Sequence, residues 1–144
     1  MIKIDYPAYH PKIKKEEGKD FIFDLFRKRW VVLTPEEWVR QNFLQYLTGT
    51  MCYPASLIAI EKQLMLGDLK KRFDIVVYDK QSKPFMIIEC KEMNVALSEN
   101  VLQQALRYNT NIQARFLVIT NGSHCFAFEK ISDQFSEINS LPSF

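Results

Sequence analysis

The sequence has few of the residues on which several common functional sites depend. Its 144 residues include only four glycines, three cysteines and two histidines. The glycines, Gly18, Gly49, Gly67 and Gly122, are spaced too widely for a G-x-x-x-x-G-K phosphate loop or a G-x-G-x-x-G dinucleotide fingerprint. The sequence therefore excludes a nucleotide motor of those classes, and we expect no nucleotide partner.

The cysteines and histidines limit metal and disulfide chemistry. Cys52, Cys90 and Cys125 are an odd number with no C-x-x-C pair, which argues against a zinc ribbon or a closed disulfide set. His10 and His124 are too few for a multi-histidine metal site. We expect reduced, mostly buried thiols in a cytoplasmic protein.

Long apolar segments are also missing. No stretch approaches the ~18 apolar residues of a membrane span, and the first ten residues lack the apolar core of an export signal. We expect a soluble, unexported protein with no membrane partner. The net charge is only +2, but residues 73–144 carry an excess of acids. A cation site would need such an excess.

The length suits one domain, because a chain of this size can bury a sizeable core. Residues 1–20 combine prolines with a charge run and predict an extended N-terminal arm, either a solvated tail or a basic arm that contacts DNA. Residues 21–144 are predicted to form the single domain. Its first segment predicts a hairpin with Arg27, Lys28 and Arg29 at a positive tip.

The hydrophobic pattern predicts two helices and five strands. Thr34 and Ser98 are the expected N-caps; the first helix should end near Gly49, and the second covers residues 98–109. Residues 56–66, 72–79, 84–91, 115–120 and 125–130 are typical of strands. This order predicts an α/β domain whose central mixed sheet, a three-strand antiparallel meander plus two further strands, is flanked by helices.

Two carboxylates are predicted to lie opposite each other in the meander. If the loop between its second and third strands is symmetric about Gln81-Ser82, Asp74 faces Glu89 and Arg72 faces Lys91. Cross-strand Cβ atoms lie roughly 4.5–5.5 Å apart, so two acids there need a shared proton, a basic partner or a divalent cation. Because side chains alternate along a strand, Glu89 and Lys91 should share a face.

An ordinary ion pair between Asp74 and Lys91 would also explain this pattern. The apolar run PFMII before Glu89 favours a functional site instead. Such a run predicts a strand buried on both faces, and charged groups rarely end such a strand without partners.

These residues resemble the PD-(D/E)XK nuclease superfamily. Arg72-Phe73-Asp74, fourteen residues, and Glu89-Cys90-Lys91 match its motif, with Phe73 in place of the motif's proline. The resemblance is closest to the N-terminal nuclease domain of type I restriction enzyme R subunits and covers roughly residues 20–130. Further matches are LTPEEWVRQ at 33–41, the Q-x-x-x-Y element at 104–108 and ITNG at 119–122.

The resemblance implies a restriction-endonuclease-like core and metal-dependent hydrolysis of DNA. Asp74, Glu89 and the backbone carbonyl of Cys90 would hold Mg²⁺, for which Mn²⁺ would substitute. Lys91 would orient or help deprotonate the attacking water, and the metal would act as Lewis acid. DNA is the implied substrate, and a second copy or restriction-system subunits are the implied protein partners.

Two glutamates of the first helix are candidates for the water shell of that metal. Glu36 lies on the inward arc with Val39 and has Arg40 four residues later, which matches the superfamily's E-x-x-x-R spacing. We therefore predict Glu36 as a site residue with Arg40 beside it. Glu37 is better explained as a capping-box residue and is the second choice.

Nearby polar and basic residues predict contact with DNA. Gln104 and Tyr108 lie one helical turn apart, either as solvated rim residues or as side chains that contact DNA and support the site. Lys71 and Arg72 follow the phosphate backbone or belong to a solvated turn.

Three functions stay open at this point. The first is a Mg²⁺-dependent endonuclease domain without a motor. The second is a catalytically silent DNA- or protein-binding module of the same fold, and the third is a stand-alone resolvase of branched DNA. Asp74, Glu89 and Lys91 together favour the enzyme, since a binding module has no need for two facing acids.

Overall fold

The computed structural model describes residues 1–144 and contains two sheets and two α-helices. The strands are β1 (Ile2–Lys3), β2 (Ile13–Glu16), β3 (Lys19–Asp24), β4 (Arg29–Val32), β5 (Ile58–Leu66), β6 (Leu69–Tyr78), β7 (Pro84–Cys90), β8 (Phe116–Thr120), β9 (His124–Ile131) and β10 (Gln134–Ile138). The α-helices are α1 (Pro35–Gln45), which continues as a π-helical turn (Tyr46–Thr50), and α2 (Glu99–Tyr108), and a short 3-10 turn (Ala55–Leu57) precedes β5.

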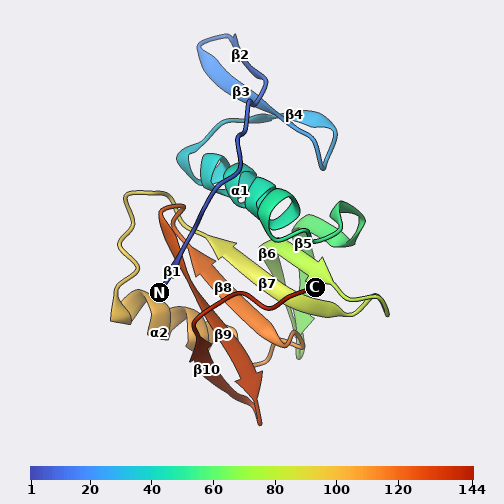
Figure 1. Cartoon of the computed structure of the whole chain (residues 1–144), viewed down its shortest axis with the longest axis vertical. Helices are drawn as coiled ribbons and strands as arrows, with labels where there is room; N and C mark the ends of the chain where they lie inside the picture. The colour runs from blue at the N-terminus through green and yellow to red at the C-terminus, as the bar shows by residue number, and fades with distance from the viewer.

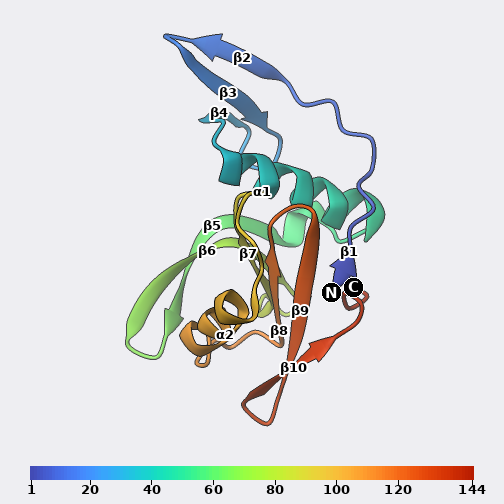
Figure 2. The ribbon, with the colours of Figure 1, turned by 90° about the vertical axis from the view of Figure 1, so that its left-hand side faces the viewer.

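The main sheet is mixed, as predicted. Its seven strands run in the order β1-β9-β8-β7-β6-β5, with β10 paired to β9. Strands β5, β6 and β7 form the antiparallel meander, and α2 connects β7 to its parallel neighbour β8. The smaller sheet, β2-β3-β4, stands beyond α1, away from the main sheet (Figures 1 and 2). Neither α-helix is long and apolar enough to cross a membrane.

Both helices begin at the predicted caps. The Thr34 hydroxyl accepts a hydrogen bond from the Glu37 N–H at 3.0 Å, and the Ser98 hydroxyl accepts one from the Val101 N–H at 3.3 Å. Such bonds satisfy N–H groups that the first helical turn leaves free. Pro35, the first residue of α1, has no N–H to satisfy.

The N-terminal 20 residues are extended, but they are not a separate arm. Strand β1 pairs with β9, and β2 pairs with β3 along its whole length. Ile4 is buried beside the main sheet. The charged residues that suggested an arm belong to β2, which is an ordinary hairpin strand. The predicted boundary at residue 20 therefore falls inside the small sheet.

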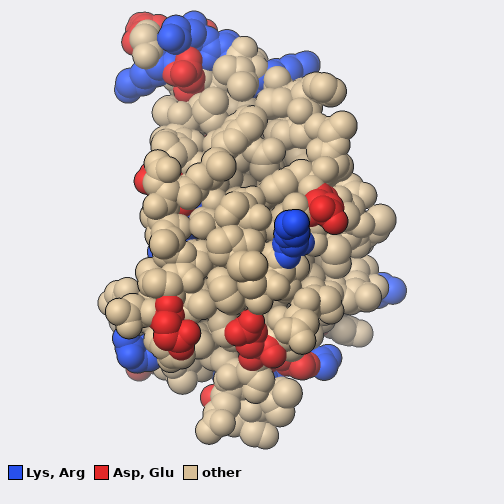
Figure 3. Space-filling view, turned by 60° about the vertical axis from the view of Figure 1, so that its left-hand side comes forward, with Lys and Arg blue, Asp and Glu red and all other residues tan.

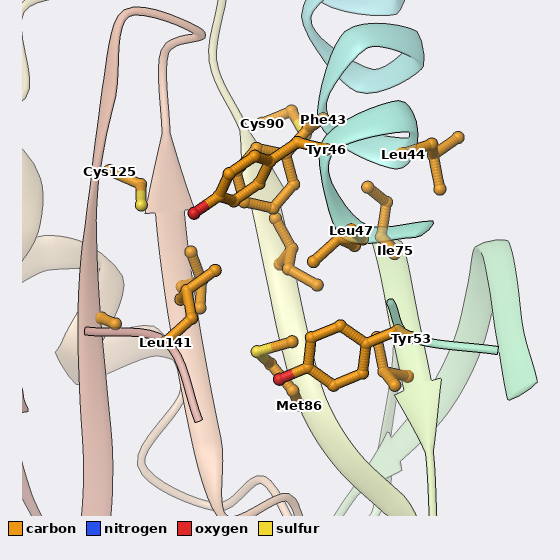
Figure 4. Close-up of a cluster of buried hydrophobic side chains, with 14 of the residues drawn as sticks. Phe43, Leu44, Tyr46, Leu47, Tyr53, Ile75, Met86, Cys90, Cys125 and Leu141 are labelled. Atoms are coloured by element: carbon orange, nitrogen blue, oxygen red, sulfur yellow. The ribbon is translucent and has the colours of Figure 1, made fainter. Parts of the chain in front are cut away.

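The main sheet is covered on both faces. Against one face, α1 packs Val39, Phe43 and Leu44 in a large core that also contains Ile75, Met86 and Cys90 (Figure 4). Against the other face, α2 packs its apolar side, with Leu102 and Ala105 buried against Ile119 and Phe128. Strand β7 is largely buried on both faces, which confirms the interpretation of its apolar run.

The register of the central hairpin agrees with the prediction over its middle. Ile75 pairs with Ile88, Val76 with Ile87 and Val77 with Met86. The register shifts after Val77, so that Tyr78 pairs with Pro84 instead of Phe85. At the other end the pairing stops before Asp74 and Glu89, and this ending decides the geometry of the site.

Candidate functional site

A cavity of about 510 Å³ opens where β6 and β7 end beside α2. We call it the α2 cavity; its lining residues are Lys71, Glu89, Lys91, Val95, Val101, Gln104, Ala105 and Tyr108. Five of these are predicted site or DNA-contacting residues that are distant in sequence. The fold therefore gathers one acid, two lysines and the Gln104–Tyr108 element around a single hollow.

Glu89 is held on the α2 side of the sheet by two polar side chains. Its Oε1 accepts a hydrogen bond from Lys71 Nζ at 2.8 Å and one from Asn109 Nδ2 at 3.2 Å. Lys71 also donates to Asn109 Oδ1 at 3.0 Å and lies 4.9 Å from the Phe73 ring centroid. Glu89 thus has a basic partner, Lys71. A basic partner is one of the three means, with a shared proton or a divalent cation, that the sequence predicted for stabilising acids at this position.

The two lysines of the cavity differ in whether their ammonium groups are bound to another side chain. Lys71 is paired with Glu89, whereas the Lys91 ammonium makes no ion pair or hydrogen bond. The backbone of Lys91 is fixed, because its N–H donates to the Thr120 carbonyl at 2.7 Å. Lys91 is therefore the cation of this cavity that is free to meet an anionic ligand.

Gln104 and Tyr108 lie on the exposed rim of α2, as the spacing predicted. Tyr108 is 67% exposed, and the Lys71 ammonium lies 6.0 Å from its ring centroid. The floor beneath them is apolar, with Ala105 buried. The ITNG segment contributes indirectly: Asn121 Nδ2 donates to the Val95 carbonyl at 3.0 Å and so ties down the loop that walls the cavity.

Asp74 belongs to a second group of charges, on the α1 side of the sheet. We call this group the Arg40 cluster; it contains Asp24, Arg27, Glu36, Glu37, Arg40, Glu61 and Asp74. Arg40 donates to Asp74 Oδ1 at 2.7 Å and to Glu37 Oε1 at 2.6 Å. The second oxygen of Asp74 accepts from the Cys90 N–H at 2.8 Å. Both oxygens of Asp74 are therefore occupied.

Burial makes this cluster electrostatically strong. The Arg40 side chain is only 6% exposed, and its Nε is buried with no hydrogen-bond partner. Burial by itself lowers the pKa of Arg40, but the hydrogen bond to Asp74 and the charge of Glu37 outweigh it and raise the pKa above its ordinary value. Arg40 thus stays charged and fixes the Asp74 carboxylate.

Asp74 and Glu89 do not share a face, contrary to the prediction. Phe73 packs in the same apolar cluster as Val76, three residues later, while Ile75 packs on the α1 side. Strict alternation is therefore broken between them. The ladder between β5 and β6 also omits the pair at Glu61 and Asp74, and Glu61 has a φ of 50°. This irregularity turns Asp74 toward Arg40 and leaves Glu89 on the side of α2.

The two helix glutamates also exchange their predicted environments. Glu37 is 6% exposed and accepts from Arg27, Arg40 and Gln41, so it is not a capping-box residue. Glu36 is 51% exposed and lies 3.7 Å from Arg40. Burial and then the charge of Asp74 raise the pKa of Glu36. The core stripe alone did not reveal that the small sheet buries the neighbouring side of α1.

The prediction of an exposed positive tip is wrong for Arg27, whose side chain is only 14% exposed and belongs to the Arg40 cluster. It pairs with Asp24, with Glu37 at 2.9 Å and with Glu61 at 3.1 Å. Arg72 was predicted to face Lys91 and to contact phosphates. It is exposed, lies opposite Gln63 of β5 in the sheet and makes no ion pair. Lys71, placed by the sequence on the DNA backbone, binds Glu89 instead.

Sequence reasoning missed several residues that hold these side chains. Asn109, fully buried, bridges Lys71 and Glu89, but an asparagine after a helix is ordinarily interpreted as a C-terminal cap. No motif or spacing in the sequence pointed to Asp24 or Glu61. Both lie in strands, β3 and β5, that also contain exposed residues. Only contacts between elements identify them.

The donor chemistry near Asp74 fits a hard cation in kind. The Asp74 carboxylate accepts a hydrogen bond from the Cys90 N–H, so it lies beside the end of β7, the strand that carries Glu89 and the Cys90 carbonyl. Hard oxygen ligands of this type suit Mg²⁺. No three acidic, histidine or cysteine side chains are grouped so that they could hold a metal ion by themselves.

One comparison with known proteins, a family match, agrees with the resemblance. Residues 35–142 match the family model described as Type I restriction enzyme R protein N terminus. A candidate nuclease of DUF820 from Anabaena variabilis aligns with the chain at 11% identity and a TM-score of 0.49, covering 93% of this chain and 80% of that chain. No curated protein matches the sequence. Since the family match spans most of the chain and includes both helices and every strand of the meander, the chain belongs to the family of type I restriction enzyme R protein N-terminal domains.

Proposed function

We propose that this chain is a metal-dependent DNA endonuclease domain. The observation that supports this most is the α2 cavity, where Glu89 lies beside a free lysine, Lys91, in a domain of the type I restriction family. An acid and a lysine two residues apart suit phosphodiester hydrolysis, because the reaction needs both activation of water and stabilisation of a charged phosphate.

The proposed metal ligands are Asp74, Glu89 and the backbone carbonyl of Cys90, with Mg²⁺ or Mn²⁺ as the ion. Such an ion, when bound, polarises the phosphate and lowers the pKa of a bound water. In the structure described here the acids have other partners: Arg40 and the Cys90 N–H for Asp74, Lys71 and Asn109 for Glu89. Arg40 and Lys71 thus supply the positive charge that these acids need.

The remaining residues of the cavity suit DNA by their chemistry. Lys91 and Lys71 offer ammonium groups to phosphate oxygens, and Gln104 offers both a donor and an acceptor. Tyr108 presents an exposed ring and hydroxyl above Lys71. Arg72, exposed on β6, is available to a phosphate further along the strand. We propose Glu36 as a further acid of the site, since its carboxylate interacts with Asp74.

A silent DNA-binding module is the second candidate. It is favoured by the ion pairs of Asp74 and Glu89, which satisfy both acids without any metal. The two candidates differ in whether an added divalent ion binds.

Plasmid nicking tests the enzyme directly. We expect the purified chain to nick supercoiled plasmid with Mg²⁺ or Mn²⁺ and not with EDTA. Glu89→Gln and Lys91→Ala should reduce nicking to background, whereas Lys80→Ala, on an exposed loop without an ion pair, should leave it unchanged. Unchanged nicking in both site variants would refute the assignment. Calorimetric titration with Mn²⁺ distinguishes the two candidates, because heat of binding is expected for the enzyme and none for the silent DNA-binding module.

A further inference from the structure

The small sheet β2-β3-β4 is anchored to the domain through one face. Ile22 and Asp24, on the inner face of β3, are fully buried. Asp24 pairs with Arg27, which reaches Glu37 on α1 and Glu61 on β5. Because Asp24 and Glu37 are buried and Arg27 is only 14% exposed, these ion pairs hold a definite geometry, so the other face of the small sheet has a fixed position on the molecule.

The outer face of this sheet is aromatic. Lys14 pairs with Phe21, Phe21 with Val32, and Phe23 with Trp30 across the strands. Cross-strand partners point to the same side, and so do residues two apart on one strand. These five side chains therefore share the outer face, which we call the aromatic platform (residues Lys14, Phe21, Phe23, Trp30 and Val32).

The platform is accessible to a ligand. Trp30 is 37% exposed and Val32 is 45% exposed, although large apolar side chains ordinarily seek burial. The rings of Phe23 and Trp30 meet edge to face with centroids 5.4 Å apart, and the Lys14 ammonium lies 4.5 Å from the Trp30 centroid. The face is thus a packed arrangement of rings under a cation, with no element of the chain covering it (Figure 2).

Basic residues surround the platform. Outside the ion pair of Arg27 and Asp24, residues 12–32 contain six basic side chains and three acidic ones, a local charge of +3. The basic ones are Lys12, Lys14, Lys15, Lys19, Lys28 and Arg29, and the acidic ones are Glu16, Glu17 and Asp20. Figure 3 shows lysine and arginine atoms gathered at this end of the molecule, together with a few acids.

We propose that the aromatic platform binds single-stranded DNA. Exposed rings bordered by cations match the two features of a single strand, unpaired bases with free faces and a chain of phosphates. A duplex offers the phosphates but hides its base faces, so it would leave the rings of Phe23 and Trp30 unused. This surface lies beyond α1, away from the α2 cavity, and its binding does not depend on whether the cavity cleaves DNA.

Tryptophan fluorescence tests the proposal on the full chain. The chain has two tryptophans, so Trp38→Phe makes Trp30 the only one, and it is excited at wavelengths that the six tyrosines do not absorb. In EDTA, which prevents metal-dependent cleavage, a short oligothymidylate should quench Trp30 in a saturable way that weakens with added salt. A duplex of equal length should bind at least about tenfold more weakly. Unquenched emission at saturation, or equal binding of the duplex, would overturn the proposal.

Variants locate the binding surface by fluorescence anisotropy of a labelled oligothymidylate. Trp30→Ala should weaken binding about tenfold, since one stacked base is lost. Phe144→Ala, at another partly exposed aromatic side chain, is the matched control and should bind like the parent. Lys14→Glu provides a second variant on an exposed strand, should Trp30→Ala unfold, and should bind at least as weakly.

Two further outcomes contradict the platform. Equal losses in Trp30→Ala and Phe144→Ala would show that binding lies elsewhere. Self-association of the parent in sedimentation, abolished by Trp30→Ala while DNA binding persists, would make this face a contact between copies of the chain. Loss of plasmid nicking in Glu89→Gln with unchanged oligothymidylate binding would support the platform as the binding surface. Such a result would show that Glu89 acts in the α2 cavity alone.

Discussion

Asp74 and Glu89 end neighbouring strands, but they lie in two different environments. In the Arg40 cluster around Asp74 the arginine side chains are 6% and 14% exposed and each contacts several acids, while Glu36 and Glu61 line a separate hollow of about 630 Å³. The α2 cavity around Glu89 is open, and its lysine partner is 32% exposed. One region fixes a carboxylate, and the other leaves charged groups where a ligand can reach them.

This difference in exposure shows that two acids on neighbouring strands of one sheet can have separate roles, one in stability and one in ligand binding. The Arg40 cluster joins the small sheet, α1 and β6 through ion pairs that cross from element to element. The α2 cavity uses an uncharged bridge, Asn109, and leaves Lys91 unpaired. We therefore expect substitutions in the first region to change mainly stability and those in the second to change mainly ligand binding.

The largest effect on stability is expected for Arg40→Met. It removes the arginine that pairs with both Glu37 and Asp74. Glu37 keeps Arg27 and Gln41, but Asp74 keeps only the Cys90 N–H, so the free energy of unfolding should fall by about 3 kcal/mol, the lower end for a broken buried pair. Urea denaturation followed by circular dichroism measures this change.

Arg115→Met is the matched control for that variant. Arg115 also pairs with an acid, Glu129, at 2.6 Å, but its side chain is 64% exposed. Solvent screens such a pair, so the loss should stay below about 1 kcal/mol. Equal losses in the two variants would remove the contrast between closed and open charge pairs.

A smaller loss is expected for Asn109→Ala, on the α2 side. Asn109 is fully buried and donates to Glu89 and to the Ala105 carbonyl, at 2.7 Å in the latter case. Removing it leaves buried acceptors with fewer partners, at a cost of about 1–3 kcal/mol. The same denaturation measures it, with Asn111→Ala as the exposed control. A loss as large as that of Arg40→Met would mean that the α2 side is no more tolerant than the α1 side.

Lys71→Met should change stability less than Arg40→Met or Asn109→Ala. Its pair with Glu89 is partly exposed and Asn109 remains bonded to the same carboxylate, so we expect less than about 1 kcal/mol. Lys70→Met, exposed on the same strand without a partner, is the control. In calorimetric titration, Lys71→Met should bind Mn²⁺ more tightly than the parent, because a competing cation has gone. Weaker binding would contradict the role of Lys71 as the metal-free partner of Glu89.

Local sequence signals predicted the elements and much of the register. Thr34 and Ser98 cap the helices because their hydroxyls satisfy nearby N–H groups, a property that acts over a few residues. The apolar run of β7 predicted a strand buried on both faces, and the pairing of Ile75 with Ile88 followed from loop symmetry. These features depend on neighbours in the chain or across one turn.

Features that depend on three elements meeting could not be predicted in this way. The inward turn of Asp74 requires an irregularity opposite Glu61 on another strand. The burial of Glu37 and the low exposure of Arg27 require the small sheet to dock on α1. Since a hairpin tip with three basic residues is solvated in most settings, the sequence favoured exposure, and only the packing of the elements reverses it.

Glu36 provides the finest test of the contrast, because it lies at the exposed edge of the Arg40 cluster. Burial and the charge of Asp74 raise its pKa above the ordinary value of 4.5. The folded state therefore holds this proton more tightly than the unfolded state does, so stability falls as the pH rises through the interval between the ordinary and the raised value. With the side chain 51% exposed, the change in stability is small, and NMR titration of the Glu36 carboxyl carbon is the better measurement. Asp74→Asn should lower the pKa of Glu36 by removing the nearby negative charge. An unchanged titration in that variant would show that Glu36 is independent of Asp74 and belongs to the solvent instead of the cluster.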